Sequence, residues 1–478
     1  MQHKEDSMEG IVNWVKTAND WLNNIVWGAP AMVLILTTGL LLSVMTRFPQ
    51  FVHFGYAIKN TIGKAFEKKK VSAGSVSPFK AMCTALAASL GTGNIAGVSG
   101  AIAIGGPGAV FWMWVSALLG MCTKFSEVTL AIRYRERNAQ GDWVGGPMYY
   151  IKNGLGKGWR WLAYVFAFLA GVACFGIGNM TQVNTIASTV NSAVSQFTVT
   201  NASQQKTIAL AVGVICAIVI AVVLLGGVTR IADVCALLVP AMAIVYILAS
   251  LSVIALNITA VPAAFAAIFK GAFHPAAAAG GLAGVGIRTA IRKGVGRGIF
   301  SNEAGLGSAP MAHAAADVSN PVKQGFFGIF EVFMDTIVIC TITSLVVLLG
   351  NGIENIPYGT DIGAQLTING FQSVFGGPLP AVVVAVCLSL FALSTILSWG
   401  LYGVRCWEFI AGPRSTRIFQ IIFVLFVVVG ATIKLDLAWG IADTLNGLMA
   451  IPNLMAVILL SPVVGRLTRE YFRSQRGL

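Results

Sequence analysis

The sequence predicts an all-α polytopic membrane protein with about eleven transmembrane helices, arranged as two halves of inverted topology. Three observations support this fold class. Of the 478 residues, 56% are hydrophobic and only 11% are charged, whereas soluble domains carry about 25% charged residues. Eleven apolar segments each approach or exceed the ~20 residues that a bilayer requires. A glycine-interrupted motif also occurs twice, at Gly91 and Gly305, with an offset of 214 residues.

The eleven spans are expected at 29–45, 79–104, 108–133, 160–192, 206–226, 231–256, 285–314, 326–350, 380–411, 416–434 and 440–464. Before them, Trp14, Ala18 and Leu22 recur at helical spacing between polar residues, which predicts an amphipathic helix lying in the membrane interface. The expected segments are an interfacial helix (1–27), an extra transmembrane helix (28–47), a basic cytoplasmic loop (48–78), a first five-helix repeat (79–256), an extracellular connection (257–284), a second five-helix repeat (285–464) and a basic cytoplasmic tail (465–478).

Charge in the loops predicts the orientation. The segments 47–80 and 133–160 hold seven and six Lys or Arg residues, while 196–206 and 351–378 hold one and none. The positive-inside rule therefore places the N-terminus outside and the C-terminus in the cytoplasm of a multi-pass protein of the cell (inner) membrane. The net charge is +13 and many of the cations cluster in these loops, so anionic lipid headgroups at the cytoplasmic face are the expected partners. Nucleic acid is not an expected partner, and no obligatory protein partner is evident.

The stretch from Ala87 to Gly97 lies inside an apolar segment but is a poor helix interior. Two glycines flank Thr92 and Asn94 follows at once; each Gly costs about 1 kcal/mol relative to Ala in a helix. A membrane helix broken here would present N–H groups at one half-helix start and carbonyls at the other half-helix end, which suit an anion and a cation. The alternative is close helix packing through small residues.

The second copy lies in the stretch from Phe300 to Pro310. It follows a segment with four basic residues, Arg288, Arg292, Lys293 and Arg297, which must face protein, water or headgroups rather than lipid. Pro107 and Pro321 share the offset of the two glycine motifs. The copies are five spans apart, so the second enters the membrane inverted. Glycine-interrupted helices at matching positions of inverted halves are the best sequence indication of a transporter binding site.

Three segments carry a family resemblance: Gly91–Gly97, Gly145-Gly146-Pro147-Met148-Tyr149-Tyr150, and Ser301–Ser308. The chain resembles the alanine/glycine:cation symporter family from Trp27 to about Pro462. This family is similar in fold to the leucine-transporter group, with a 5+5 inverted repeat and two discontinuous helices, here preceded by one extra helix. The resemblance implies a symporter, not an enzyme, that couples sodium influx to uptake of small neutral amino acids, chiefly alanine and glycine. Sodium would be the co-transported ion, and no cofactor is expected.

An amino-acid zwitterion needs an anion pole and a cation pole close together, and a pair of broken helices supplies both from backbone groups. Gln182 can both donate and accept hydrogen bonds; the alternative is that it bonds a neighbouring helix. Trp399 lies one turn past Thr395, so we expect it to wall the pocket against larger side chains, unless it packs on a neighbouring helix or in the interfacial belt. The expected substrate-binding residues are Thr92, Gly93, Asn94, Gln182, Phe300, Ser301, Glu303, Gly305 and Trp399.

By analogy with the fold, carbonyls and hydroxyls complete a sodium site, because hard oxygen ligands suit a hard cation. The expected ligands are Ala87, Leu90, Phe391, Ser394 and Thr395. The alternative for the two hydroxyls is a bond to their own helix backbone. Asn94 and Asp335 are candidates for a second cation.

An intramembrane carboxylate is a functional hypothesis by default. We expect Glu303 to hold the substrate ammonium or to counter the cations of 288–297. Glu127 lies three residues from Lys124, a helical ion-pair spacing, so a structural pair is the stronger interpretation there. Four other acids are expected near span ends, in contact with headgroups or solvent: Asp233, Glu331, Glu408 and Asp443.

Other functions are less consistent with the sequence. A channel usually needs a continuous pore built by oligomer symmetry, and an enzyme needs a nucleophile–base or metal set. The eight cysteines form no CxxC pair and the four histidines are scattered, so no metal site is expected. A proton-coupled transporter, or one for glutamine or serine, on the same fold is the alternative within this class.

Overall fold

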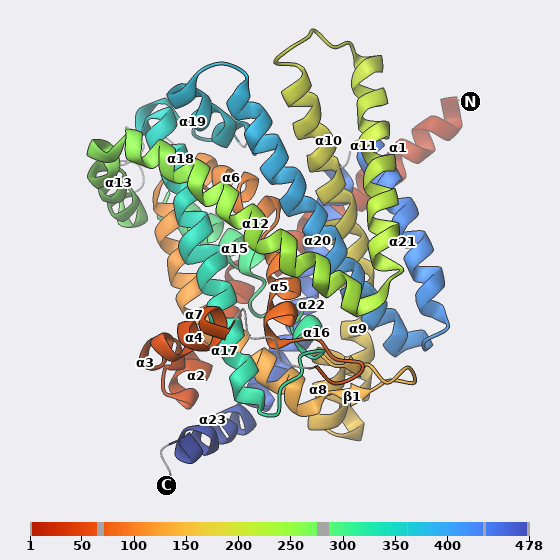
Figure 1. Cartoon of the computed structure of the whole chain (residues 1–478). Helices are drawn as coiled ribbons and strands as arrows, with labels where there is room; N and C mark the ends of the chain where they lie inside the picture. The colour runs from red at the N-terminus through yellow and green to blue at the C-terminus, as the bar shows by residue number, and fades with distance from the viewer. Residues whose placement is uncertain (1, 65–70, 275–285, 361, 434–435, 476–478) are drawn as a thin grey trace.

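The computed structural model describes residues 2–64, 71–274, 286–360, 362–433 and 436–475, which are almost entirely helical (Figure 1). The first half contains α1 (Gln2–Val26), α2 (Ala29–Thr46), α3 (Pro49–Val52), α4 (Phe54–Thr61), η1 (Ile62–Lys64), α5 (Pro78–Ser89), η2 (Thr92–Asn94), α6 (Ala96–Gly105), α7 (Gly108–Tyr134), α8 (Pro147–Gly154), η3 (Lys157–Trp159), α9 (Arg160–Phe175), the π-helical η4 (Gly176–Met180), α10 (Thr181–Val194), α11 (Ala202–Leu224), α12 (Gly227–Leu256), η5 (Ile258–Ala260) and α13 (Val261–Phe273). A short antiparallel pair, β1 (Glu136–Arg137) and β2 (Trp143–Val144), lies between α7 and α8.

The second half has the same all-helical character. It contains α15 (Ile287–Asn302), α16 (Pro310–His313), α17 (Pro321–Val332), the π-helical η6 (Phe333–Cys340), α18 (Thr341–Asn351), η7 (Ile353–Asn355), α19 (Gln365–Phe375), α20 (Leu379–Ala411), α21 (Ser415–Thr432), α22 (Asp436–Leu459) and α23 (Ser461–Gln475).

The described part of the chain confirms a polytopic membrane protein. Nine helical stretches are long and apolar enough to cross a bilayer, and a tenth candidate is α5 with η2 and α6, bent by 59° at its break. The predicted span 285–314 is not among them, because α15 carries the four basic residues and the chain leaves the helix after Asn302. The count of eleven therefore remains a prediction for this segment.

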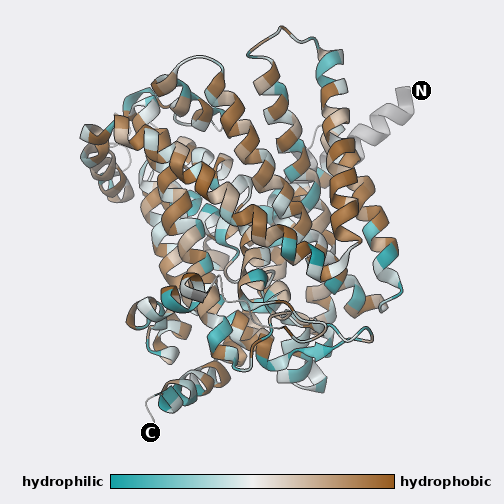
Figure 2. Ribbon diagram, in the orientation of Figure 1, coloured by the Kyte–Doolittle hydropathy of each residue, from teal (hydrophilic) through white to brown (hydrophobic). Residues whose placement is uncertain are grey.

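Apolar side chains cover the outside of the bundle. Figure 2 shows hydrophobic residues along α11, α12, α20 and α21, and hydrophilic residues gathered around β1, α8 and the C-terminus. Large apolar side chains of α11 and α12 are exposed, among them Ile215, Ile218, Leu237 and Leu248. Such a belt is stable only against lipid, because monomeric soluble proteins rarely expose large contiguous apolar patches.

Some segment boundaries differ from the sequence prediction. The stretch from Trp14 to Thr46 forms one candidate span, so the second half of α1 leads into α2. Trp27 donates its indole N–H to the Asp443 carbonyl of α22, at 3.0 Å. Whether the first turns of α1 lie along the membrane surface remains a prediction.

The sequence reading also missed two helices in the connections. α13 lies in the expected connection 257–284, of which residues 275–284 fall outside the described residues, and it packs on α7 and α15. α19 lies in the connection 351–378 and packs on α18, α20 and α6. α6 therefore packs on a helix of this connection, not on a bare loop.

Two helices organise the interior. α7 packs against α15, α17 and α2, and α20 packs against α5, α9, α10 and α12. The segments before the first break and after the second also join directly: the Val76 N–H donates to the Ala315 carbonyl at 2.9 Å, and the Asp317 N–H donates to the Val76 carbonyl at 2.7 Å. Both broken segments are thereby anchored to each other at one face of the molecule.

Candidate functional site

The first break is a true interruption of the helix. α5 ends at Ser89, and Leu90 and Gly91 leave the helical conformation before η2 begins at Thr92. Asn94 closes this turn, because its Oδ1 accepts the Gly91 N–H at 2.9 Å. A Cβ at Gly91 would lie 2.7 Å from the Thr395 hydroxyl, so only glycine allows this approach to α20.

Four of the five expected sodium ligands come together here. The Thr395 hydroxyl lies 3.0 Å from the Ala87 carbonyl and 2.9 Å from the Phe391 carbonyl. The Ser394 hydroxyl lies 2.9 Å from the Phe391 carbonyl and 3.5 Å from that of Ala87. Leu90, the fifth, is fully buried just past the end of α5. These oxygens of α5 and α20 form a compact group of hard donors, which fits an alkali cation better than a soft metal.

Asn94 also connects the first break to η6. Its Nδ2 donates to the Asp335 carboxylate at 2.6 Å. The same oxygen accepts the Ser301 hydroxyl at 3.1 Å, and the Thr336 hydroxyl donates to the other oxygen at 2.7 Å. Asp335 is fully buried, so three hydrogen bonds replace its hydration. The two residues proposed for a second cation are therefore in direct contact.

The second break follows α15. Glu303 takes a left-handed conformation with φ 57°, and Gly305 and Gly307 follow with φ 90° and 81°. A non-glycine residue in this region costs free energy and persists only where its surroundings fix it. Asn302 contributes to this, because its Oδ1 accepts the Ala304 N–H at 3.0 Å.

The contacts of Glu303 differ from the expectation that it counters the cations of 288–297. Its carboxylate accepts the Ser308 hydroxyl at 2.5 Å and the Trp399 indole N–H at 3.0 Å. Among the described residues, neither Arg292 nor Arg297 pairs with it, because the left-handed turn directs its side chain toward α20. Those cations lie elsewhere: Arg292 donates to Asn24 at 2.8 Å and Arg297 stacks on Phe300 at 5.5 Å.

A residue of α22 that the sequence analysis did not single out supports the second break. Asn453 donates to the Gly305 carbonyl at 2.9 Å and also to Glu127. The Tyr150 hydroxyl donates to the Oδ1 of the same Asn453 amide. The sequence did carry a signal for this residue: Asn453 is a polar side chain in the apolar run of α22. A polar side chain inside a span costs free energy unless it finds a hydrogen-bond partner.

Two further expectations about acids are wrong. Lys124 pairs with Glu331 at 3.1 Å, and Glu127 is instead bound to Asn453. Glu331 is fully buried, not at a span end, because α17 begins at Pro321 and places it in the third turn of that helix. Hydropathy gave a later start for the span because Lys323 and Gln324 lower the average.

A cavity of about 560 Å³ reaches the first break from the face that carries α19. Its lining includes Thr92, Gly93 and Phe300, with hydroxyl-bearing residues of α10 and with Arg297. Three of the nine expected substrate residues thus line the cavity. The other six are buried beneath it: Asn94, Gln182, Ser301, Glu303, Gly305 and Trp399.

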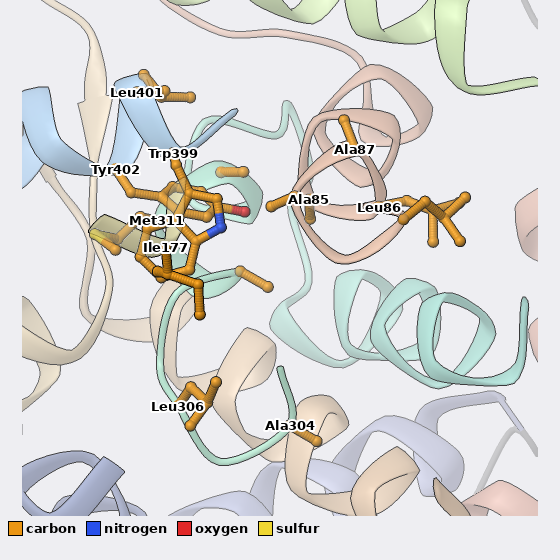
Figure 3. Packing of buried hydrophobic residues seen from close by; sticks show 14 of the residues in the cluster. Ala85, Leu86, Ala87, Ile177, Ala304, Leu306, Met311, Trp399, Leu401 and Tyr402 are labelled. Carbon is orange, nitrogen blue, oxygen red and sulfur yellow. The ribbon is translucent and has the colours of Figure 1, made fainter. Parts of the chain in front are cut away.

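Gln182 and Trp399 occupy different positions under this cavity. The Gln182 Oε1 has no hydrogen-bond partner among the described residues and faces Gly91 at the break, while its Nε2 donates to the Ile177 carbonyl at 3.0 Å. Trp399 is 1% exposed and lies with Tyr402, Met311 and Ile177 (Figure 3). It does not line the described cavity, so its role as a size filter remains a prediction.

Comparisons with known proteins agree with this architecture. The crystal structure of MhsT in complex with L-phenylalanine matches with a TM-score of 0.56 at 14% identity, over 84% of this chain and 99% of that chain. A manganese transporter of Eremococcus coleocola matches with a TM-score of 0.51 at 15% identity, over 85% and 88% of the two chains. At such identities the likeness shows the fold alone, and it is the expected leucine-transporter type. The fold is therefore of the leucine-transporter type, with two broken helices at its centre.

The sequence comparisons identify the protein family. Residues 12–477 match the model of the sodium:alanine symporter family, and the chain belongs to that family. It is 45% identical over 454 residues to the sodium/alanine symporter AgcS of Methanococcus maripaludis, covering 94% of this chain and 96% of that protein. It is also 36% identical over 456 residues to the probable sodium/glutamine symporter GlnT of Bacillus subtilis, covering 95% and 90%. The expected family is confirmed.

Replacing Asn94 by alanine tests the link between the first break and η6. The Asn94→Ala variant loses the acceptor for the Gly91 N–H and a donor to the buried Asp335 carboxylate, and each unsatisfied buried group costs about 1–3 kcal/mol. We expect coupled uptake to be lost while the protein still reaches the membrane. Asn60→Ala is the control, because that amide bonds only its own helix. Normal uptake by Asn94→Ala would show that the break is a packing device.

Filling the cavity at Gly93 tests whether the substrate sits against the first break. A Cβ there would lie 3.4 Å from the Phe300 ring, so a leucine side chain must enter the cavity. We expect Gly93→Leu to lose alanine binding in detergent, measured by calorimetry. In Gly97→Ala the new methyl group has room, with its nearest neighbour at 3.9 Å, and binding should persist. Unchanged binding in Gly93→Leu would place the site elsewhere.

Proposed function

We propose that this protein couples sodium influx to the uptake of alanine and glycine by alternating access. The observation that carries the proposal is the convergence of α5 carbonyls and α20 hydroxyls directly beneath the glycine break. Ala87, Phe391, Ser394 and Thr395 are the sodium ligands in this proposal, with Leu90 as the fifth. The match to a sodium/alanine symporter at 45% identity supports the same ion and substrate.

The substrate would bind where the cavity ends. Its carboxylate rests on N–H groups around Gly93 and Asn94, because a half-helix N-terminus attracts negative charge. Gln182 contributes its unpartnered Oε1 to the ammonium group. In this arrangement the two charges of the zwitterion are held chiefly by dipoles and fixed backbone groups.

The position of the cavity supports an outward-open state of the transport cycle in this proposal. It opens beside α19 and the α10–α11 connection, a side whose loops are poor in Lys and Arg. With the basic loops in the cytoplasm, this is an outward-open state in the cell (inner) membrane. The N-terminus lies outside and the C-terminus inside. Anionic lipid headgroups then contact the basic loops and α23.

Removing the Thr395 hydroxyl tests the proposed ion site. Purified protein in lipid vesicles should accumulate labelled alanine under an inward sodium gradient. The Thr395→Val variant should need about tenfold more sodium, or more, for half-maximal uptake. Loss of one good ligand costs about 1.4 kcal/mol, which corresponds to a factor of about ten in sodium affinity. Thr432→Val is the control, because that hydroxyl bonds only its own helix.

Two outcomes would contradict the proposal. Uptake that is independent of sodium would remove the coupling ion, and an unchanged sodium requirement in Thr395→Val would move the ion site. Competition by unlabelled glycine, serine and glutamine measures the substrate range. Stronger competition by glutamine than by alanine would favour the activity named for the Bacillus subtilis relative.

A further inference from the structure

Beneath the second break lies a cluster of buried ionisable side chains that the proposed transport mechanism does not use. It comprises Lys124 and Glu127 of α7, Glu303 of the second break, and Glu331 of α17, with His313 of α16 beside them. All five are at most 3% exposed. Charges in such surroundings must be paired or neutralised, because an isolated buried ion costs many kcal/mol.

The one cation of this cluster is already paired. The Lys124 ammonium lies 3.1 Å from the Glu331 carboxylate, and both side chains are fully buried. This pair is neutral as a unit, so the carboxyls of Glu127 and Glu303 are left without a counter-ion of their own.

His313 does not supply a second positive charge. The Gln324 Nε2 lies 2.9 Å from the His313 Nδ1 and 3.3 Å from the Pro78 carbonyl. A carbonyl oxygen only accepts, so the atom facing Pro78 must be the amide nitrogen. The Nδ1 therefore accepts a hydrogen bond and carries no proton. The ring is neutral, and its Nε2–H donates to Glu331 at 3.0 Å.

The other ionisable groups around the cluster add no positive charge. They are Tyr150 of α8, Tyr402 of α20 and Asp335 of η6. Lys293 and Arg297 of α15 act instead on Asp443 of α22. Among the described residues, the three carboxyls of the cluster, with Asp335 beside them, thus meet one ammonium.

The hydrogen bonds of the two excess carboxyls leave room for a proton. The Ser308 hydroxyl donates to the Glu303 Oε2 at 2.5 Å; because a hydroxyl can also accept a hydrogen bond, a protonated Glu303 would keep this contact. The Glu127 Oε2 has no hydrogen-bond partner among the described residues. Both carboxyls also touch the same backbone turn, because Asn453 joins Glu127 to the Gly305 carbonyl.

We propose that the second break is a proton-binding site, at which Glu127 or Glu303 is a neutral carboxylic acid in this conformation. Loss of that proton to water leaves an uncompensated carboxylate against the Glu303–Ser308 turn. The observed shape of the turn is then disfavoured as pH rises, so transport depends on pH. This last consequence rests on the proposed function, whereas the presence of the proton does not.

Infrared spectroscopy of the purified full chain tests the proton directly. A neutral carboxyl has a C=O stretching band above the amide I region that shifts on exchange into D₂O. We expect such a band in the wild type at neutral pH, and its reduction in Glu127→Gln, in Glu303→Gln or in both, with loss of that component in the double variant. A wild-type spectrum without the band, or a band unchanged in the double variant, would overturn the proposal.

The pH dependence of uptake tests the consequence. At a fixed sodium gradient, wild-type alanine uptake should fall as pH rises, and the Glu127→Gln variant in combination with Glu303→Gln should lose this dependence. Asp233→Asn is the matched control, because that acid is exposed and pairs with Lys80 outside the cluster. An identical pH profile in the double variant and the wild type would contradict the proposal. If the wild type shows no sodium-driven uptake, the proposed function fails, while the infrared result still decides the proton.

Discussion

The structure depends on one constraint: a helix broken inside a bilayer must find new partners for its backbone groups. Lipid offers none, so irregular backbone is stable only where protein or a water-filled cavity supplies them. Asn94 and the Thr395 hydroxyl provide them at the first break, and Asn302 and Asn453 provide them at the second. α20 and α22 lie where Thr395 and Asn453 can reach the backbone of the two breaks. η6 lies where its Asp335 accepts the hydrogen bond of Asn94.

The same constraint connects the proposed ion site and the proposed substrate site. The Ala87 carbonyl and the Gly91–Asn94 turn belong to one short stretch of chain, so a cation held by the former fixes the geometry of the latter. Asn94 extends this contact to Asp335 and Ser301 on the second broken segment. In the proposed mechanism, binding of one ligand therefore pre-organises the site of the other. By thermodynamic linkage, the effect must be equal in both directions.

Much of this arrangement could be predicted from the sequence, because the decisive signals are local. Glycines at a fixed offset identified both breaks, and the hydroxyls of Ser394 and Thr395 indicated the helix that meets the first one. The destination of buried charges could not be predicted in this way. Lys124 has Glu127 at helical spacing but pairs with Glu331 across two helices, and Glu303 turns toward Trp399 through a left-handed residue. Such choices depend on tertiary packing, as does the partnership of Asn453 with Gly305.

The central claim is that sodium and alanine bind to one connected site. Calorimetry of alanine binding to the purified protein, in sodium and in potassium at equal ionic strength, tests it most directly. The account predicts tight binding in sodium, weak or undetectable binding in potassium, and an apparent affinity that rises with sodium concentration. Equal alanine affinity in the two salts would contradict it.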